Sequence, residues 1–71
     1  MNRAFGDRLK AAREAMGFDT ASDFARKIGV ERLTYYRWER GETKPADLEH
    51  LARIRNVTGK SLDWLLLGIR D

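Results

Sequence analysis

The sequence predicts an all-α fold of five short helices, and three features of the chain point to it. Apolar residues recur at steps of three or four, and no stretch of any length alternates between apolar and polar residues. Six glycines and a single proline are scattered along the chain, and most of them stand between these periodic segments, where they can end helices and form turns. The chain has 71 residues and no cysteine, so it has room for one modest core and no disulfide framework. We therefore expect residues 1–71 to form a single domain.

The first helix is predicted over residues 4–16, with Asn2 or Arg3 at its start. Gly17 follows it directly and can end it in the left-handed conformation, which glycine adopts without a steric penalty. One face of this helix is apolar, as expected for a helix that packs on a core. That face consists of Phe5, Leu9, Ala12 and Met16.

The second helix is predicted to begin after Thr20 and to end at Gly29. Thr20 and Asp23 form a capping-box pattern in which aspartate replaces the usual glutamate. The inward stripe of this helix consists of Phe24, Ala25 and Ile28. Gly29 then ends the helix abruptly and permits a tight turn.

The third helix is predicted over residues 31–40, directly after that turn, with Gly41 as its C-cap. Tyr35 and Trp38 are three residues apart, so they lie on one side of the helix and are expected to face the core rather than to form a stacking platform for single strands. The residues of this helix that are expected to lie outside the core are Arg32, Leu33, Tyr36 and Arg37. In an arbitrary helix such a face is usually only solvated.

Pro45 disfavours helix in the residue before it, so residues 41–45 are predicted to form a loop. Asp47 can then cap a fourth helix, which Gly59 ends. The inward stripe of the fourth helix is expected to consist of Leu48, Leu51, Ile54 and Val57.

Ser61 is predicted to cap a short fifth helix, with Asp63 in its first turn, where a negative charge suits the helix dipole. Residues 62–67 are apolar nearly all round, and so short a helix cannot hide both faces within its own domain. Part of this surface is expected to pack on the core and part to form a twofold dimer contact. The expected dimer contact consists of Trp64, Leu66, Leu67 and Ile69.

The composition excludes several classes of function. The net charge is +3, but 11 acidic residues accompany 14 basic ones, so charge alone is weak evidence for nucleic acid. The longest apolar run, residues 64–67, cannot span a bilayer, and residues 1–10 contain no signal-peptide core, so we expect a soluble, cytoplasmic protein. His50 is the only histidine and is expected to be a surface residue, because no second ligand stands at a metal spacing. No nucleophile stands with a histidine and an acid, so we predict no enzyme, no cofactor, no metal and no small-molecule ligand.

The second and third helices match a helix-turn-helix in their spacing, over residues 21–40. The small Ala25 lets the two helices approach each other, and Gly29 permits the turn. The run from residue 24 to 41, FARKIGVERLTYYRWERG, resembles the helix-turn-helix of the lambdoid phage repressor and Cro family, the XRE-type transcriptional regulators. The resemblance extends to residues 5–17 before the motif and to GETKP and SLDWLLLG after it. It therefore covers nearly the whole chain, in the family's five-helix, repressor-like order.

The resemblance implies a transcriptional regulator that binds duplex DNA at a specific sequence. A repressor or Cro-like protein of this kind binds a palindromic operator as a homodimer, with the third helix in the major groove. Bases would then be read by Arg32, Leu33 and Arg37, with Thr34 and Tyr36 beside them. Phosphates would be held by Thr20, Ala21 and Ser22 at the start of the second helix, and by Thr43 and Lys44 in the loop.

The resemblance also implies a buried ion pair between Arg13 and Glu39 that links the first helix to the third. Glu31 stands where the family usually has a serine or threonine cap. A carboxylate there is repelled by DNA unless it accepts from cytosine N4 or from the N–H groups of its own helix. Tyr35 stands where a β-branched aliphatic residue is usual, so it should shift the packing slightly or let its hydroxyl reach solvent. Ala21 replaces a glutamine that often contacts DNA in the family.

Two other functions are compatible with the same sequence. An antitoxin-like or partner-binding helix-turn-helix protein would hold another protein with its apolar C-terminal helix, and DNA binding would be secondary. A purely structural module would have no nucleic-acid role, and Arg32→Ala and Arg37→Ala would then leave every interaction unchanged. The arginines expected on the outer face of the third helix favour the DNA-binding regulator over both.

Overall fold

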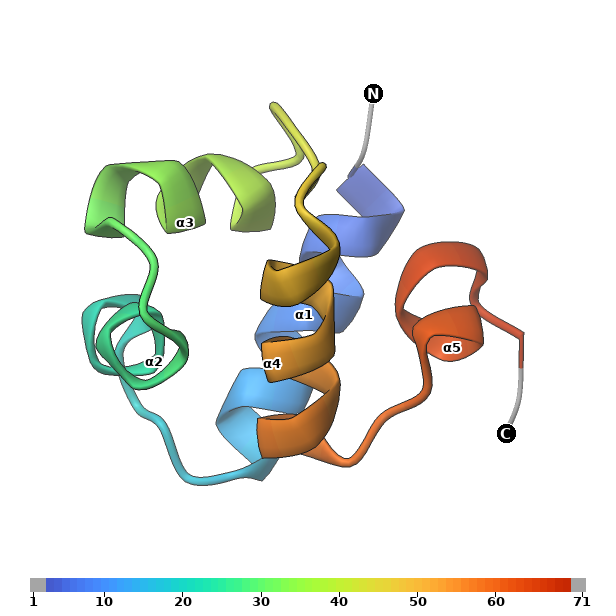
Figure 1. The fold of residues 1–71 in the computed structure, drawn as a ribbon, viewed down its shortest axis with the longest axis horizontal. Helices are drawn as coiled ribbons and strands as arrows, with labels where there is room; N and C mark the ends of the chain where they lie inside the picture. Colours follow the sequence, from blue (N-terminus) through green and yellow to red (C-terminus); the bar gives the residue numbers. More distant parts are fainter. Residues whose placement is uncertain (1–2, 70–71) are drawn as a thin grey trace.

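The computed structural model describes residues 3–69, and within this range the chain forms five helices and no strand, as predicted (Figure 1). The helices are α1 (Arg3–Ala15), α2 (Ala21–Ile28), α3 (Arg32–Glu39), α4 (Leu48–Thr58) and α5 (Leu62–Leu67). In Figure 1, α4 lies in front of α1, with α2 and α3 on one side of this pair and α5 on the other. Asn2, one of the two expected starts of the first helix, and both ends of the expected domain 1–71 lie outside the described residues.

Three helices begin at the capping residues that the sequence predicts. Thr20 caps α2, Asp47 caps α4 and Ser61 caps α5. Each side-chain oxygen accepts a backbone N–H from two or three residues further along, at 2.8–3.1 Å. Gly29 and Gly59 end α2 and α4 in the left-handed conformation, also as predicted. These boundaries depend only on residues within one helical turn, which is why the sequence suffices to find them.

Two helix ends differ from the predictions. α1 ends at Ala15, and the chain turns away from the helix axis at Gly17, where φ is 87°. Met16 is therefore half-exposed, and its assignment to the inward stripe was wrong. The C-cap of α3 is Arg40, which still has helical φ and ψ, and Gly41 takes the left-handed conformation one residue later.

The core contains side chains from all five helices and from the turn between α2 and α3. Its buried members are Phe5, Leu9, Phe24, Ala25, Ile28, Val30, Tyr35, Trp38, Ile54 and Leu65. Leu48 is 78% exposed, so the prediction that it faces the core was wrong. Because an α-helix has 3.6 residues per turn, each three-residue step moves a side chain about 60° around the axis. Leu51 is still buried one step from Ile54, whereas Leu48 has left that face after two.

Gly6 lets α1 approach the last turn of α3 closely. A Cβ atom at this position would lie 2.7 Å from the carbonyl oxygen of Trp38 and would also clash with the carbonyl oxygen of Glu39. The obstructing atoms belong to the backbone, so no rotamer change can make room for a side chain. An isolated glycine inside a helical stretch, where glycine is unfavourable, is the one sequence signal of this crossing.

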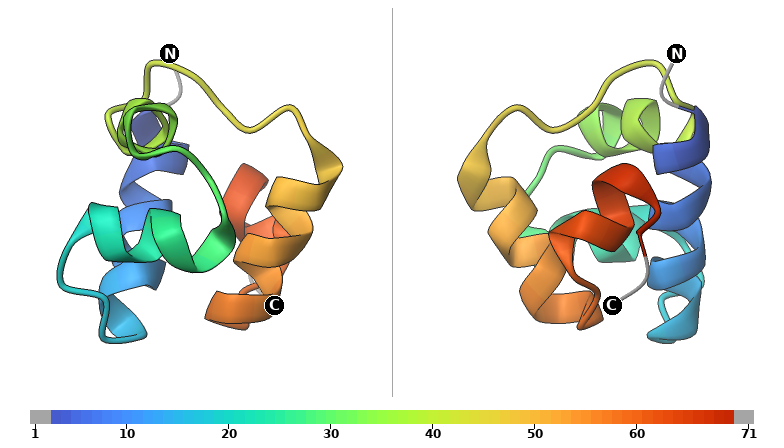
Figure 2. Two further views of the ribbon diagram at one scale, coloured as in Figure 1. Left: turned by 60° about the vertical axis from the view of Figure 1, so that its left-hand side comes forward. Right: turned by 90° about the vertical axis from the view of Figure 1, so that its right-hand side faces the viewer.

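The α2–α3 unit forms the predicted helix-turn-helix. Gly29 adopts a φ of 73°, and the N–H of Val30 donates to the carbonyl of Ala25 at 2.9 Å, which closes the turn. Figure 2 (left) shows α3 end-on above α2, which runs across the view, so the outer side of α3 protrudes from the molecule. Figure 2 (right) shows α5 on a different face, between α1 and α4. No helix within residues 3–69 has the length and apolar character needed to cross a membrane.

Candidate nucleic-acid interface

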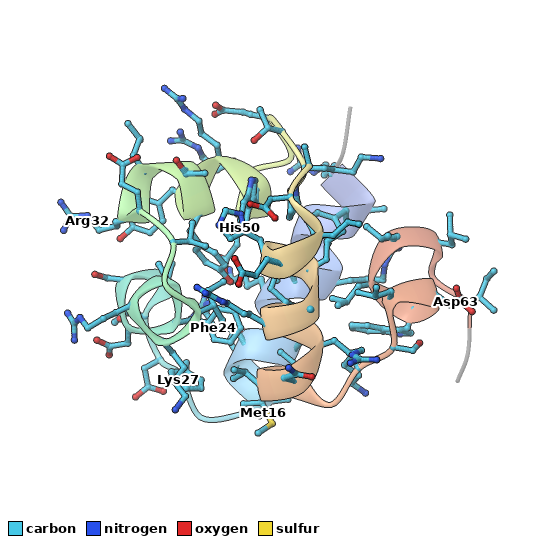
Figure 3. The ribbon with its side chains drawn as sticks, in the orientation of Figure 1. Met16, Phe24, Lys27, Arg32, His50 and Asp63 are labelled. Carbon is cyan, nitrogen blue, oxygen red and sulfur yellow. The ribbon has the colours of Figure 1, made fainter. Side chains whose placement is uncertain are left out.

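α3 has one buried face and one exposed face. Tyr35 and Trp38 are buried in the core, as predicted. The opposite face carries the residues expected to read bases. Of these, Arg32, Leu33, Tyr36 and Arg37 are exposed, and Thr34 is half-buried. Figure 3 shows the Arg32 side chain extending away from the fold at the start of α3.

A row of ring contacts attaches α3 to the rest of the fold. The ring centroids of Phe24 and Tyr35 are 5.5 Å apart, and those of Tyr35 and Trp38 are 5.9 Å apart. His50, which was expected to be a surface residue, is half-buried and continues the row, with its ring centroid 5.7 Å from that of Trp38. Tilted and edge-to-face contacts at such separations are favourable. They connect α2 through α3 to α4, so the core sets the orientation of the exposed face of α3.

The structure brings Arg13 and Glu39 together as a buried pair that joins α1 to α3. The Arg13 Nε lies 2.7 Å from the Glu39 Oε2, and the two side chains are 5% and 11% exposed. A second guanidinium nitrogen, Nη2, donates to the Glu39 Oε1 at 3.3 Å. The remaining one, Nη1, donates to the Phe18 carbonyl at 2.7 Å, so every nitrogen of the Arg13 guanidinium has an acceptor.

Tyr35 completes this pair, so of the two outcomes expected for its bulk, a hydroxyl that reaches solvent was wrong. Its hydroxyl donates to the Glu39 Oε2 at 2.5 Å. Burial, followed by the hydrogen bond to Glu39 and the charge of Glu39, raises the pKa of Tyr35 well above its usual value. Burial alone would lower the pKa of Arg13, but the hydrogen bond and charge of Glu39 outweigh it and raise that pKa. The Tyr35 phenol thus stays neutral and serves as a further donor to the Arg13–Glu39 pair.

The residues expected to hold phosphates lie in two segments, with α3 between them (Figure 2, left). At the start of α2, the Thr20 hydroxyl is occupied as the N-cap, while Ala21 and Ser22 are half-buried. In the loop after α3, Thr43 and Lys44 are exposed.

A groove of about 380 Å³ lies between the end of α3 and the start of α4. Its lining includes Arg37 from the exposed face of α3, Thr43 and Lys44 from the loop, and His50 from α4. The groove therefore places a predicted base-reading residue beside both predicted loop residues. Thr34, a second predicted base-reading residue, also lines the groove. The lining residues that sequence reasoning did not place at the site are Trp38, Pro45, Ala46, Asp47 and His50.

α5 is divided between the core and the surface, as the sequence suggested. Leu65 is fully buried, and its carbonyl accepts a hydrogen bond from the Arg8 side chain at 3.0 Å, which ties α5 to α1. Of the residues expected in a dimer contact, Trp64 and Leu66 are half-buried against the core, whereas Leu67 and Ile69 are 68% and 53% exposed. The exposed part of this set lies on the other side of the molecule from α2 and α3 (Figure 1).

Comparison with known proteins shows which family this chain is similar to. The helix-turn-helix family matches residues 9–65, which include all of α2, α3 and α4. An uncharacterised HTH-type transcriptional regulator of Haemophilus influenzae is 47% identical over 47 residues, or 66% of this chain. YonR of Bacillus subtilis, an uncharacterised HTH-type transcriptional regulator derived from the SPbeta prophage, is 38% identical over 66 residues, or 90% of the chain. YqaE of the same organism, also an uncharacterised HTH-type transcriptional regulator, is 36% identical over 64 residues.

The chain spans only part of these relatives. The matched stretches make up 19% of the Haemophilus protein, 57% of YonR and 53% of YqaE. No solved structure matches the chain significantly.

Proposed function

Since this chain belongs to the helix-turn-helix family, we propose that it is a transcriptional regulator, not an enzyme, that binds duplex DNA at a specific sequence. The observation that carries this proposal is the division of α3. Tyr35 and Trp38 hold the helix in the core, and the two arginines Arg32 and Arg37 project from its outer side. A helix presented in this way fits the major groove of B-DNA. Such a regulator acts where the DNA is, so we also propose a cytoplasmic location.

Sequence would be read from the outer face of α3. Arg32 and Arg37 carry donors in a fork that matches the O6 and N7 acceptors of guanine. Leu33 lies between them along the helix and offers an apolar contact for a thymine methyl group. Thr34 and Tyr36 would lie beside these contacts, on base edges or on the backbone.

Phosphates would be bound on both sides of α3. The first backbone N–H groups of α2, at Ala21 and Ser22, have no partner within the helix and point toward its positive dipole end. Thr43 and Lys44 would bind a second phosphate from the loop. Contacts of this kind set the position of the protein on DNA but carry no sequence information.

Arg37→Ala and Lys44→Ala separate the two kinds of contact. We expect Arg37→Ala to cost roughly 1–3 kcal/mol on the preferred site and to relax the preference at one base pair. Lys44→Ala should weaken binding to all sequences about equally and lower the salt slope by roughly 0.9. The measurement is binding-site selection from a random duplex pool, followed by titrations of the selected site and of random DNA at several salt concentrations.

The proposed function would be contradicted if the wild-type protein selected no sequence over random DNA. If Arg37→Ala and Lys44→Ala instead lowered affinity uniformly on every duplex, binding would stand and the assignment of Arg37 to base reading would be wrong.

We further propose that the protein binds a palindromic operator as a homodimer, in the manner of a repressor or Cro-like protein. Leu67 and Ile69 are exposed apolar side chains at the end of α5, and Trp64 and Leu66 are only partly covered by the core. A twofold contact places the same patch of each subunit against its copy, so one small apolar surface can serve both.

A Leu67→Asp variant tests this dimer. Its charge would be placed in the apolar contact, and we expect the dimer dissociation constant to rise at least tenfold, while the monomer keeps its fold because Leu67 is outside the core. Sedimentation equilibrium measures the association, and Leu48→Asp, at a leucine on α4 that is also mostly exposed, is the matched control. A wild-type chain that stays monomeric on its selected DNA would contradict the dimer. Stable co-purification with an unrelated protein would favour the antitoxin-like alternative, which the same exposed residues fit.

A further inference from the structure

Glu31 is an unusual residue for the leading edge of a helix that enters a DNA groove. It is the N-cap of α3, immediately before Arg32, and it is exposed. The DNA surface is negatively charged, so an unpaired carboxylate at this position lowers affinity for duplex DNA in general. It therefore needs either a structural role in the helix or a specific partner on the DNA.

The structural role as a cap is not fulfilled. The Glu31 side chain accepts no hydrogen bond from the N–H groups at the start of α3, in contrast to Thr20, Asp47 and Ser61 on three other helices. Across residues 3–69 it also forms no ion pair with any arginine or lysine. Of the two alternatives that the sequence leaves open, capping by the Glu31 side chain is therefore not realised, and the contact to a cytosine amine remains.

The contact that Glu31 does make orients it toward this role. The Thr34 hydroxyl donates to the Glu31 Oε1 at 3.0 Å, across one turn of the exposed face of α3. This bond uses the only proton of the hydroxyl, so Thr34 can offer only lone pairs to an outside group. The ionised carboxylate likewise offers only lone pairs. Glu31 and Thr34 thus form a surface that accepts hydrogen bonds and donates none, next to the donors of Arg32.

On the basis of the proposed function, we infer that Glu31 is a specificity-determining residue that selects cytosine at the base pair facing the first turn of α3. In the major groove, cytosine presents its N4 amine as a donor and no acceptor beside it. Adenine presents the N7 acceptor beside its N6 donor, and guanine and thymine present oxygen acceptors. The Glu31 carboxylate is repelled by each of these acceptors. Thr34 acts through Glu31 as a positioning residue.

This assignment also accounts for the neighbouring residues. Arg32 follows Glu31 directly and is suited to guanine, so the two residues together would favour a G·C pair, or two adjacent ones, at this end of the half-site. The charges of Arg32 and Arg37 offset the repulsion between the Glu31 carboxylate and the phosphates. The carboxylate thus lowers the affinity for duplex DNA in general but increases the discrimination between base pairs.

The test compares the wild type with Glu31→Gln, which preserves the size of the side chain and an acceptor for Thr34. Each protein is titrated with four duplexes that carry the selected operator and differ only at the candidate base pair. The wild type should prefer cytosine by roughly 5- to 100-fold over the other three bases. In Glu31→Gln the cytosine preference should be lost and adenine should become the best base, because an amide matches adenine N6 and N7. Thr34→Val should lower the cytosine preference at the same position without creating one for adenine.

Glu14→Gln is the matched control, because it removes the same charge in the last turn of α1, at the end of the molecule away from α3 (Figure 1). It should leave the preference at every position unchanged. Circular dichroism should show equal thermal unfolding for Glu31→Gln and the wild type, because the Glu31 side chain does not cap α3.

The outcomes separate this inference from the proposed function. If the wild type selects an operator and Glu31→Gln keeps the same base preference at every position, the role of Glu31 is refuted while the proposed function stands. If the wild type selects no operator, both are refuted.

Discussion

A Gly6→Ala variant is expected to unfold about 10–20 °C below the wild type, which corresponds to a loss of roughly 2–3 kcal/mol. In an ordinary helix this substitution is favourable by about 1 kcal/mol, because alanine has the higher helix propensity. Here the added methyl group would meet the backbone carbonyl oxygens of Trp38 and Glu39, so α1 and α3 must separate. Thermal unfolding followed by circular dichroism measures the change.

Gly17→Ala is the matched control for Gly6→Ala. Gly17 has a positive φ of 87°, and no atom lies within 4 Å of the position a Cβ would occupy. This variant incurs only the cost of a left-handed alanine, about 1 kcal/mol. A Gly6→Ala protein that is as stable as the wild type would mean that α1 does not approach the end of α3 as closely as described. Since the same crossing orients α3, weaker DNA binding should accompany the lower stability.

The second large effect is expected at Glu39. Glu39→Ala would leave the Arg13 guanidinium buried without its carboxylate and the Tyr35 hydroxyl without its acceptor. Losing one partner of a buried ion pair costs about 3–5 kcal/mol. A domain of this size has a total stability of roughly 4–10 kcal/mol, so the substitution would remove about a third of it or more. Urea denaturation gives the free energy of unfolding for comparison with the wild type.

Two further variants keep this prediction testable if Glu39→Ala does not fold. Glu39→Gln retains an acceptor for Tyr35 and Arg13 and should lose less stability than Glu39→Ala. The double variant Arg13→Met with Glu39→Leu removes both charges, and it should be more stable than Glu39→Ala alone, because no buried charge remains. If Glu39→Ala cost less than 1 kcal/mol, the pair would be solvated in solution.

The sequence predictions are accurate where the interacting residues are close together in the chain. The caps at Thr20, Asp47 and Ser61 involve partners only two or three residues away, so residue type and spacing suffice to find them. The turn at Gly29 is equally local. Leu48 shows the limit of periodicity, because its three-residue spacing fits a stripe whose drift around the axis takes it out of the core.

At the candidate interface, too, short-range features were predicted from spacing and long-range contacts were not. The outward position of Arg32, Leu33 and Arg37 follows from the inward position of Tyr35 and Trp38, which three-residue spacing predicts. The resemblance to a known family supplied the pairing of Arg13 with Glu39, which no spacing rule gives for residues 26 apart. The Tyr35 hydroxyl has its acceptor, Glu39, one turn further along the same helix, but only the packing of the core turns the phenol toward it. The ring of His50 packs on Trp38, which belongs to a different helix.

The sequence by itself thus determined the five helices, the caps at Thr20, Asp47 and Ser61, the helix-turn-helix and the outer face of α3, all of which depend on residues within a turn or two of one another. Only the tertiary structure decided that Gly6 is a crossing point, that Tyr35 joins the Arg13–Glu39 pair and that His50 packs on Trp38. It also decided that the Glu31 side chain does not cap its own helix. The physical reason is that these features depend on distances between separate elements and on the rotamers that packing and competing partners select. The periodicity of one chain segment contains neither the distances nor the rotamers.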